Sequence, residues 1–201
     1  MEALTFIAVY FDNEANKNEQ MERLPLIETD RLMLRALEVE DSLALFDYFS
    51  KELVMQYYDL SPFKSIEEAT EMINTWHKRT ERGEGYRWGI TLKDSTVIGT
   101  CGFHNISKEH NRAELGYDLH PDYWGKGIAT EACAALIEHG FEQLQYHRIE
   151  AYIDPLHTAS RRVLHKVGMK TEGCLRDYFF EKGEFVDAEI LSIINNYDNV
   201  K

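Results

Sequence analysis

The sequence predicts one α/β domain built on a mixed, mostly antiparallel sheet of seven strands, with helices on both faces. Runs that alternate apolar and polar residues, typical of strands, are interleaved with runs at helical spacing in the order βααβββαβαββ. The 201 residues are 44% hydrophobic, enough to form one sizeable core. We expect an N-terminal extension over residues 1–23 and the domain over residues 24–201.

The first half of the domain opens with a strand at residues 29–37, where two leucines and an alanine alternate with Arg31, Met33 and Arg35. Residues 38–50 follow as a helix that carries Leu43, Phe46 and Phe49 at helical spacing. A second helix starts after Ser65, with an apolar face at Ile66, Ala69, Ile73 and Trp76. Three strands at about 86–92, 97–106 and 112–119 complete this half, separated by turn-rich segments.

The second half repeats the alternation. A long helix begins at Ile128, and residues 148–154 read as a strand. Residues 157–167 form a short helix that Gly168 ends, because glycine is a favourable C-cap residue. The last strands form a hairpin that turns at Lys182 and Gly183.

Charge and cysteine usage limit the classes of partner. Acidic residues outnumber lysine and arginine by 35 to 22, giving a formal charge of −13, which argues against nucleic-acid binding because that affinity comes from basic residues. The three separated cysteines suit reduced thiols in the cytoplasm. No apolar run approaches the roughly 20 residues of a membrane span, and the histidines lack metal-ligand spacing. We expect a cytoplasmic protein with no metal.

The first twenty residues change from an apolar run, 4–11, to a run rich in Asn and Glu. A secretory signal would begin with basic residues and end at a small-residue cleavage site, and neither is present. The segment is either a docking strand or sequence that precedes a natural start at Met21.

Two glycines precede the long helix, in the stretch Trp124, Gly125, Lys126, Gly127. The first backbone amides of a helix have no partner within the helix, and the helix dipole adds positive charge there. Glycine lets an anion approach the backbone closely and permits positive φ. The Walker and dinucleotide patterns are absent, so these residues alone indicate a phosphate site without naming its ligand.

The run AELGYDLHPDYWGKGIATEA, followed by RIEAYIDPLHTASRRVLHKVGMKTEGCLRD, resembles the GNAT superfamily of acetyl-CoA-dependent N-acetyltransferases, and within it the RimJ/RimL-like branch. The resemblance covers roughly residues 24–196. WGKGIATEA looks like the pyrophosphate loop, whose general form is [QR]xxGx[GA]. Gly127 and Ala129 fit that form, whereas Trp124 stands where Gln or Arg is usual.

The resemblance implies a GNAT fold with a splay between strands 4 and 5, into which the pantetheine arm of acetyl-CoA inserts. It implies that backbone amides from Gly125 to Thr130 hold the pyrophosphate and that the Leu119 amide faces the thioester oxygen, as an oxyanion donor. The implied acetyl-CoA residues are Leu119, His120, Trp124, Gly125, Lys126, Gly127, Ile128, Ala129, Thr130, His157 and Ser160.

Two proton-handling roles follow from the same resemblance. The donor to the departing thiolate falls on Ser160, because Leu164 occupies the position of the usual tyrosine; Ser160 also suits a helix start. Glu114 is the candidate base, with Asp118, Glu150 and a water relay as alternatives. A glutamate that some RimL-like enzymes carry before the final hairpin is replaced here by Phe179.

Two further residues carry alternative readings. His157 replaces the usual Asn that binds pantetheine, and it either takes over that role or caps the helix. Lys166 either reaches the nucleotide phosphates or lies on the surface.

Acceptor specificity is expected from the early helices and the final hairpin. The candidate wall residues there are Tyr57, Tyr58, Phe63 and Trp76, against core packing as the alternative. The acceptor is a primary amine, either a protein N-terminus such as that of a ribosomal protein or a small amine such as a polyamine, an amino acid or an antibiotic. A CoA-binding module without catalysis is the alternative of another class. The apolar strand ends could also form the interface of a homo-oligomer.

Overall fold

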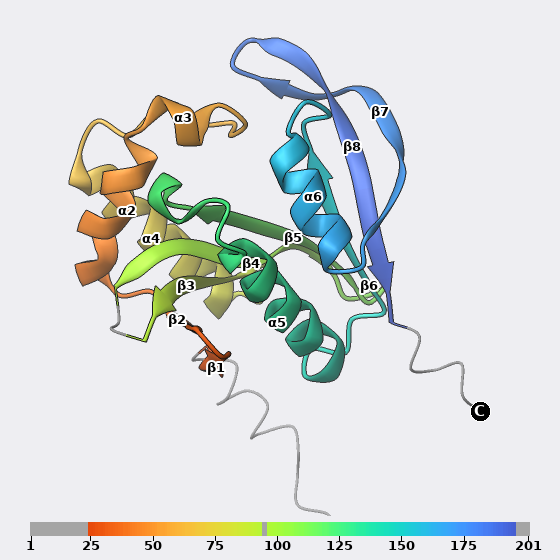
Figure 1. The fold of residues 1–201 in the computed structure, drawn as a ribbon, viewed down its shortest axis with the longest axis horizontal. Helices are drawn as coiled ribbons and strands as arrows, with labels where there is room; N and C mark the ends of the chain where they lie inside the picture. Colours follow the sequence, from red (N-terminus) through yellow and green to blue (C-terminus); the bar gives the residue numbers. More distant parts are fainter. Residues whose placement is uncertain (1–23, 94–95, 196–201) are drawn as a thin grey trace, which may run out of the picture.

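The computed structural model of the chain describes residues 24–93 and 96–195 (Figure 1). The predicted extension over residues 1–23 and the last six residues of the predicted domain lie outside this part.

The described residues form a single eight-stranded sheet in the order β1-β2-β3-β4-β5-β6-β8-β7. Neighbouring strands are antiparallel except β5 and β6, which are parallel, so the predicted mixed, mostly antiparallel sheet is confirmed. The strand missing from the predicted seven is β1, whose two residues are too few to show an alternating pattern. The strands are β1 Ile27–Glu28, β2 Leu32–Ala36, β3 Tyr86–Leu92, β4 Val97–Ser107, β5 Arg112–Leu119, β6 Arg148–Ile153, β7 Lys170–Glu181 and β8 Glu184–Ile194.

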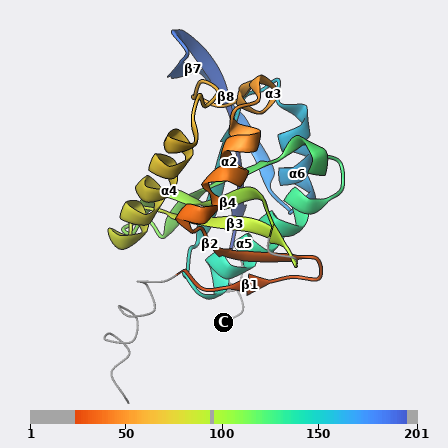
Figure 2. The same ribbon diagram turned by 90° about the vertical axis from the view of Figure 1, so that its left-hand side faces the viewer.

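Helices cover both faces of the sheet, with α4 on one face and α5 and α6 on the other (Figures 1 and 2). The unpredicted helix α3 spans only four residues, one turn, which leaves no periodicity to detect. The helices are α2 Ser42–Phe49, α3 Glu52–Met55, α4 Ile66–Glu81, α5 Ile128–Glu142 and α6 Thr158–Lys166, with short 3-10 turns η1 Val39–Asp41 and η2 Pro121–Tyr123.

Each face has its own hydrophobic cluster. One joins Ala132 and Leu136 of α5 to the sheet, and the other joins Ile73 of α4 to α2. The face that α2 buries differs from the predicted one: Leu45 and Tyr48 are buried with Phe49, while Leu43 is exposed. Tyr48 accounts for the difference, because its hydroxyl bonds to a buried carboxylate of the sheet.

The sheet splits between β5 and β6. These strands pair only over three residues each, from Arg112 to Glu114 and from Arg148 to Glu150. Beyond this point β5 stays with β4 as far as Leu119, whereas β6 follows β8. The splay predicted between the fourth and fifth strands is therefore confirmed, since the additional β1 makes them β5 and β6.

The β7–β8 hairpin turns at Lys182 and Gly183, as predicted. Both residues have positive φ, 50° and 92°, which is the geometry that a two-residue turn requires. The Lys182 ammonium donates a hydrogen bond to the Met55 carbonyl oxygen at 2.6 Å, which ties the tip of the hairpin to α3.

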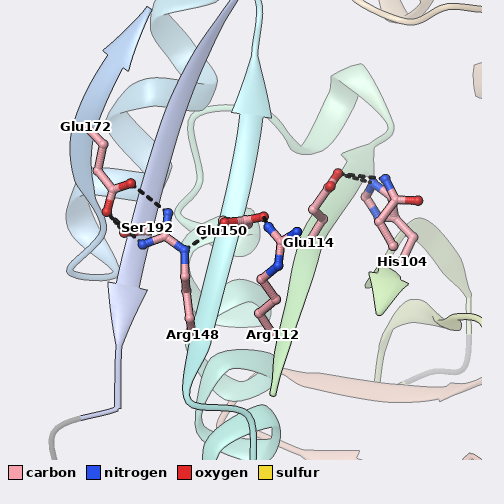
Figure 3. A network of polar contacts seen from close by, with 8 residues as sticks. His104, Arg112, Glu114, Arg148, Glu150, Glu172 and Ser192 are labelled. Atoms are coloured by element: carbon pink, nitrogen blue, oxygen red, sulfur yellow. Dashed lines mark hydrogen bonds and ion pairs between the residues drawn. The ribbon is translucent and has the colours of Figure 1, made fainter. Parts of the chain in front are cut away.

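An ion-pair network joins the strands at the point where the sheet splits (Figure 3). The buried Glu150 carboxylate accepts hydrogen bonds from Arg112 at 2.6 Å and from Arg148 at 2.7 Å. Arg148 also makes a bidentate contact with Glu172 of β7, at 2.8 and 2.6 Å. Because loss of its arginine partners would leave the buried Glu150 charge unpaired, the network favours one fixed separation of these strands.

The Glu172 carboxylate makes the fold sensitive to acid. Hydrogen bonds from Arg148 and Ser192 lower its pKa from 4.5 to about 2. A carboxylate whose pKa is lower in the folded state stabilises the fold, and this stabilisation is complete at pH values above the pKa of the unfolded chain, about 4.5. The stabilisation is lost as pH falls from about 4.5 to about 2.

We therefore expect Glu172→Gln to have a lower free energy of unfolding than wild type at pH 7, with the difference shrinking as pH falls towards 2. Urea unfolding at a series of pH values measures this difference. Glu138→Gln, at an exposed position of α5, serves as the control, with no comparable pH trend. A constant difference for Glu172→Gln between pH 7 and pH 2 would contradict the linkage.

Candidate active site

A cleft of about 770 Å³ occupies the place where β5 and β6 part. Its walls come from the end of β5, the start of α5, the first turns of α6, the segment after α3 and the β7–β8 hairpin. Most of the predicted residues line it, namely Glu114, Leu119, Trp124, Gly125, Gly127, Ile128, Ala129, Thr130, His157 and Ser160. His120 and Lys126 are outside the lining.

The glycine loop before α5 has the backbone geometry that its sequence predicts. Gly125 and Gly127 have φ of 72° and 76°, and Gly127 is the N-cap of α5. A Cβ at Gly125 would meet nothing within 4 Å, so the backbone there is open to an approaching group. The unpaired amides of the first helical turn can therefore hold an anion at this end of the cleft.

A clamp that the sequence analysis missed supports this loop from outside the cleft. Arg31 donates to the Lys126 carbonyl oxygen at 3.0 Å and pairs with Glu131 of α5 at 2.6 Å. Thr29 donates to the same carboxylate at 2.6 Å. Thr29 and Arg31 lie about 100 residues from the loop along the chain, so local sequence patterns do not reveal these contacts.

The Leu119 backbone faces the opening. His120 donates its amide to Ile98 of β4 at 2.7 Å, and successive amides of a strand point to opposite edges, so the Leu119 amide points towards the splay. The Trp124 indole donates to the Leu119 carbonyl oxygen at 2.7 Å, which fixes the end of β5 to the glycine loop. Trp124 thus has a definite structural task at the position where the family pattern has Gln or Arg.

His120 directs its side chain to α2. Its Nε2 lies 3.0 Å from an Asp47 carboxylate oxygen, and its Nδ1 accepts from the Asp122 amide at 3.1 Å. The imidazole is therefore occupied by protein partners. Lys126, the other residue outside the lining, places its ammonium 5.3 Å from the centre of the Tyr123 ring.

Ser160 is buried in the first turn of α6 and does not cap it, because His157 is the N-cap. The Ser160 hydroxyl oxygen lies 2.7 Å from the Tyr117 hydroxyl oxygen of β5. The alternative reading of Ser160 as a helix cap is therefore wrong. Tyr117, which also lines the cleft, was missed because a tyrosine in an alternating strand reads as ordinary packing.

His157 stacks on Tyr57, with ring centroids 4.2 Å apart and planes at 16°. Its side chain makes no capping hydrogen bond, so the side-chain capping alternative is wrong. Burial lowers the pKa of the imidazole although Asp154 opposes this effect. A neutral imidazole with one donor and one acceptor therefore lies at the cleft wall.

Asp118 is the centre of a buried cluster. Its carboxylate accepts from Tyr48 at 2.6 Å and from Tyr58 at 3.0 Å, and it pairs with Arg87 of β3. Thr100 of β4 adds its amide at 3.0 Å and its hydroxyl at 2.6 Å. With five donors on two oxygens, this carboxylate is occupied in holding the end of β5.

The other two carboxylates proposed from the sequence differ in their surroundings. Both oxygens of Glu150 are taken by arginines, and Glu150 does not line the cleft. Glu114 lines it and has one oxygen 3.0 Å from the Asn105 amide nitrogen and 3.4 Å from His104 (Figure 3). Of the three carboxylates, Glu114 is the one that faces the cleft with spare acceptor capacity.

The wall opposite the glycine loop is aromatic. Tyr57, Tyr58 and Trp76 line the cleft, as predicted, together with Phe179 of the hairpin. Phe63 does not: it is buried against Phe49, with ring centroids 5.2 Å apart. Lys166 of α6 also lies along the cleft.

Residues 24–93 and 96–195 offer neither a metal site of clustered ligands nor a membrane-spanning helix. No group of three or more His, Cys, Asp or Glu side chains is placed to hold a metal ion. No helix in these ranges is long and apolar enough to cross a membrane.

Comparison with known proteins gives consistent findings. Residues 31–170 match the acetyltransferase (GNAT) domain family. The chain is 40% identical over 171 residues to YoaA of Bacillus subtilis, an uncharacterized N-acetyltransferase, covering 85% of this chain and 97% of that protein.

Two solved structures below 25% identity share the fold. RimL, a ribosomal L7/L12 alpha-N-protein acetyltransferase in complex with coenzyme A, superimposes with a TM-score of 0.78 at 23% identity, over 85% of this chain and 98% of that one. Spermidine N-acetyltransferase from Vibrio cholerae, in complex with CoA and spermine, superimposes with a TM-score of 0.72 at 24% identity. The superposition covers 83% of this chain and 96% of that one. The family match over most of the domain, together with the split sheet and its glycine loop, shows that the chain belongs to the GNAT acetyltransferase family and is an acetyl-transferring enzyme.

Proposed function

We propose that the protein transfers the acetyl group of acetyl-CoA to a primary amine by direct attack of the amine on the thioester. One observation carries the proposal: a helix N-terminus suited to phosphate, a free strand edge and the Ser160 hydroxyl all line one cleft. The free edge ends at Leu119, whose amide, pointing towards the splay, would stabilise the oxyanion.

The donor half of the cleft fits the proposed cosubstrate. The amides from Gly125 to Thr130 would hold the pyrophosphate, and Lys126 would add a charge at the rim. The pantetheine arm would pair with the open edge of β5, as a strand does. His157 would face the amide groups of that arm, since its neutral ring offers both a donor and an acceptor.

The amine must lose a proton before it attacks, and Glu114 is the proposed acceptor of that proton. Glu114 lies five positions before Leu119 on the strand, a span of about 16 Å, so the proton would travel through water. Asp118 and Glu150 are less suitable because arginines and hydroxyl donors already engage their oxygens.

The acceptor is proposed to be a protein N-terminus, such as that of a ribosomal protein, with a small polyamine, amino acid or antibiotic as the alternative. RimL and spermidine N-acetyltransferase, which share the fold, carry these two kinds of acceptor in their names. Carboxylates along the cleft, at Asp59, Asp154, Glu181 and Asp187, would attract a cationic amine of either kind.

The cellular setting is also part of the proposal. Cys101, Cys133 and Cys174 are unpaired, which fits a reducing cytoplasm. The domain over residues 24–201 would act with acetyl-CoA and the amine alone. A homo-oligomer also remains a proposal from the sequence.

The first test is acceptor-dependent thiol release from acetyl-CoA. We expect release with at least one member of a panel of N-terminal peptides of ribosomal proteins, polyamines and amino acids, and mass spectrometry of the products identifies the acetylated nitrogen. Acetyl-CoA binding by calorimetry without thiol release for any amine would contradict the proposed transfer to a primary amine.

The glycine loop gives a second prediction. Gly127→Ala places a Cβ on a left-handed residue at the proposed phosphate site, so KM for acetyl-CoA should rise about tenfold, equivalent to about 1.4 kcal/mol. Gly168→Ala is the matched control because Gly168 is also left-handed, with φ of 91°, but does not line the cleft. It should lower stability and leave KM unchanged; an equal KM for Gly127→Ala and wild type would remove the phosphate assignment.

The donor assignment gives a third prediction. Ser160→Ala should lower kcat about 100-fold while KM for acetyl-CoA stays the same, because the hydroxyl would act only as the sulfur leaves. Steady-state kinetics at saturating amine measures both constants. Wild-type kcat in this variant would exclude Ser160 as the proton donor.

A further inference from the structure

Tyr117 and Ser160 form a hydroxyl pair across the cleft wall, between β5 and the first turn of α6. The Tyr117 oxygen lies 2.7 Å from the Ser160 hydroxyl oxygen and 3.3 Å from the Ser160 carbonyl oxygen. Either hydroxyl can donate in the 2.7 Å contact, and the phenol is the better donor because it is the more acidic of the two. With Tyr117 as the donor, the hydrogen of the Ser160 hydroxyl is free to point elsewhere.

The surroundings keep the pair in this arrangement. Ser160 is buried, and burial raises the pKa of Tyr117, which keeps the phenol protonated over the working range of the enzyme. The Ser160 hydroxyl is not needed as a helix cap, because His157 occupies the N-cap position of α6. In surroundings of low dielectric constant, a hydroxyl that accepts one hydrogen bond becomes a stronger donor of the next.

Both residues border the space that the proposed reaction needs. Tyr117 is two residues before Leu119 on β5, and both line the cleft with Ser160. A sulfur leaving from a thioester near the Leu119 amide would depart beside the Ser160 hydroxyl. No contact from Tyr117 to the sulfur is required.

We propose that Tyr117 is a positioning residue that orients and strengthens Ser160 as the proton donor to the leaving thiolate. As the amine nitrogen bonds to the carbonyl carbon and the carbon–sulfur bond breaks, sulfur takes the bonding electrons and the Ser160 proton. The Tyr117 hydrogen bond stabilises the charge that develops on the Ser160 oxygen. The proton that the amine nitrogen releases returns to Ser160 through water, which balances the transfer. This inference rests on the proposed function.

A double-mutant cycle tests the inference. Tyr117→Phe removes one oxygen atom and should lower kcat about tenfold, with KM for acetyl-CoA within about twofold of wild type. In a Ser160→Ala background the same change should alter kcat by less than about twofold, because Tyr117 acts through Ser160. Tyr146→Phe is the matched control: Tyr146 is a buried tyrosine of the same core, away from the cleft, and its loss should leave kcat unchanged.

A second measurement needs no amine acceptor. Titration of the ultraviolet thiolate absorbance of the enzyme–CoA complex gives the pKa of the bound thiol, which a nearby donor lowers. Tyr117→Phe should raise this pKa, Ser160→Ala should raise it further, and Tyr146→Phe should leave it at the wild-type value. If no amine is acetylated, the proposed function fails while this titration still reports on the pair.

Three outcomes would overturn the inference. One is that the kcat losses of Tyr117→Phe and Ser160→Ala multiply in the double variant. Another is that Tyr117→Phe leaves both kcat and the bound thiol pKa unchanged in a protein whose thermal unfolding matches wild type. The third is that Tyr117→Phe abolishes turnover while Ser160→Ala does not, which would make Tyr117 itself the donor.

Discussion

The short parallel pairing of β5 with β6 is the constraint on which the rest of the structure depends. Three paired residues on each strand keep the sheet continuous, and the divergence that follows exposes strand edges without unfolding either half. Exposed backbone polar groups in a protein interior are costly unless they find partners. The cleft thus presents backbone hydrogen-bonding groups that an extended, strand-like ligand can pair with. Leaving these groups unpaired in the free protein costs folding free energy, which the rest of the fold offsets.

Two polar clusters hold this opening from its two ends. At the closed end, Glu150 lies between Arg112 and Arg148. At the open end, Asp118 collects donors from α2, from the segment after α3 and from two strands. Both carboxylates are buried and fully engaged, and such groups contribute more to a defined geometry than to net stability. The position of the Leu119 amide therefore depends on side chains that belong to nearly every element around it.

The position of the splay followed from the resemblance to the GNAT superfamily. Local sequence patterns were sufficient for most of the elements and for the glycine loop, because periodicity and positive-φ glycines are encoded in neighbouring residues. They were insufficient for β1 and α3, which are too short for a pattern, and for the buried face of α2, which Tyr48 sets through its bond to Asp118. The same limit hid the Arg31 clamp and the partnership of Tyr117 with Ser160, since both join residues far apart in the chain. The partners of Asp118 and Glu150, which make both carboxylates less suitable as bases, were hidden for the same reason: the residue types were visible in the sequence, but their hydrogen-bond partners were not.

The hydrogen bond from Lys182 to Met55 has a consequence for how this enzyme can diverge. It joins the tip of the β7–β8 hairpin to α3, two segments that lie close together at the top of Figure 1. Residues of α3 and of both hairpin strands line the cleft. Substitutions in these two segments change one wall of the cleft and leave the α5 loop and the end of β5 untouched. The tip of the hairpin and α3 can therefore vary together as one unit of the cleft wall, separately from the end of β5 and the glycine loop.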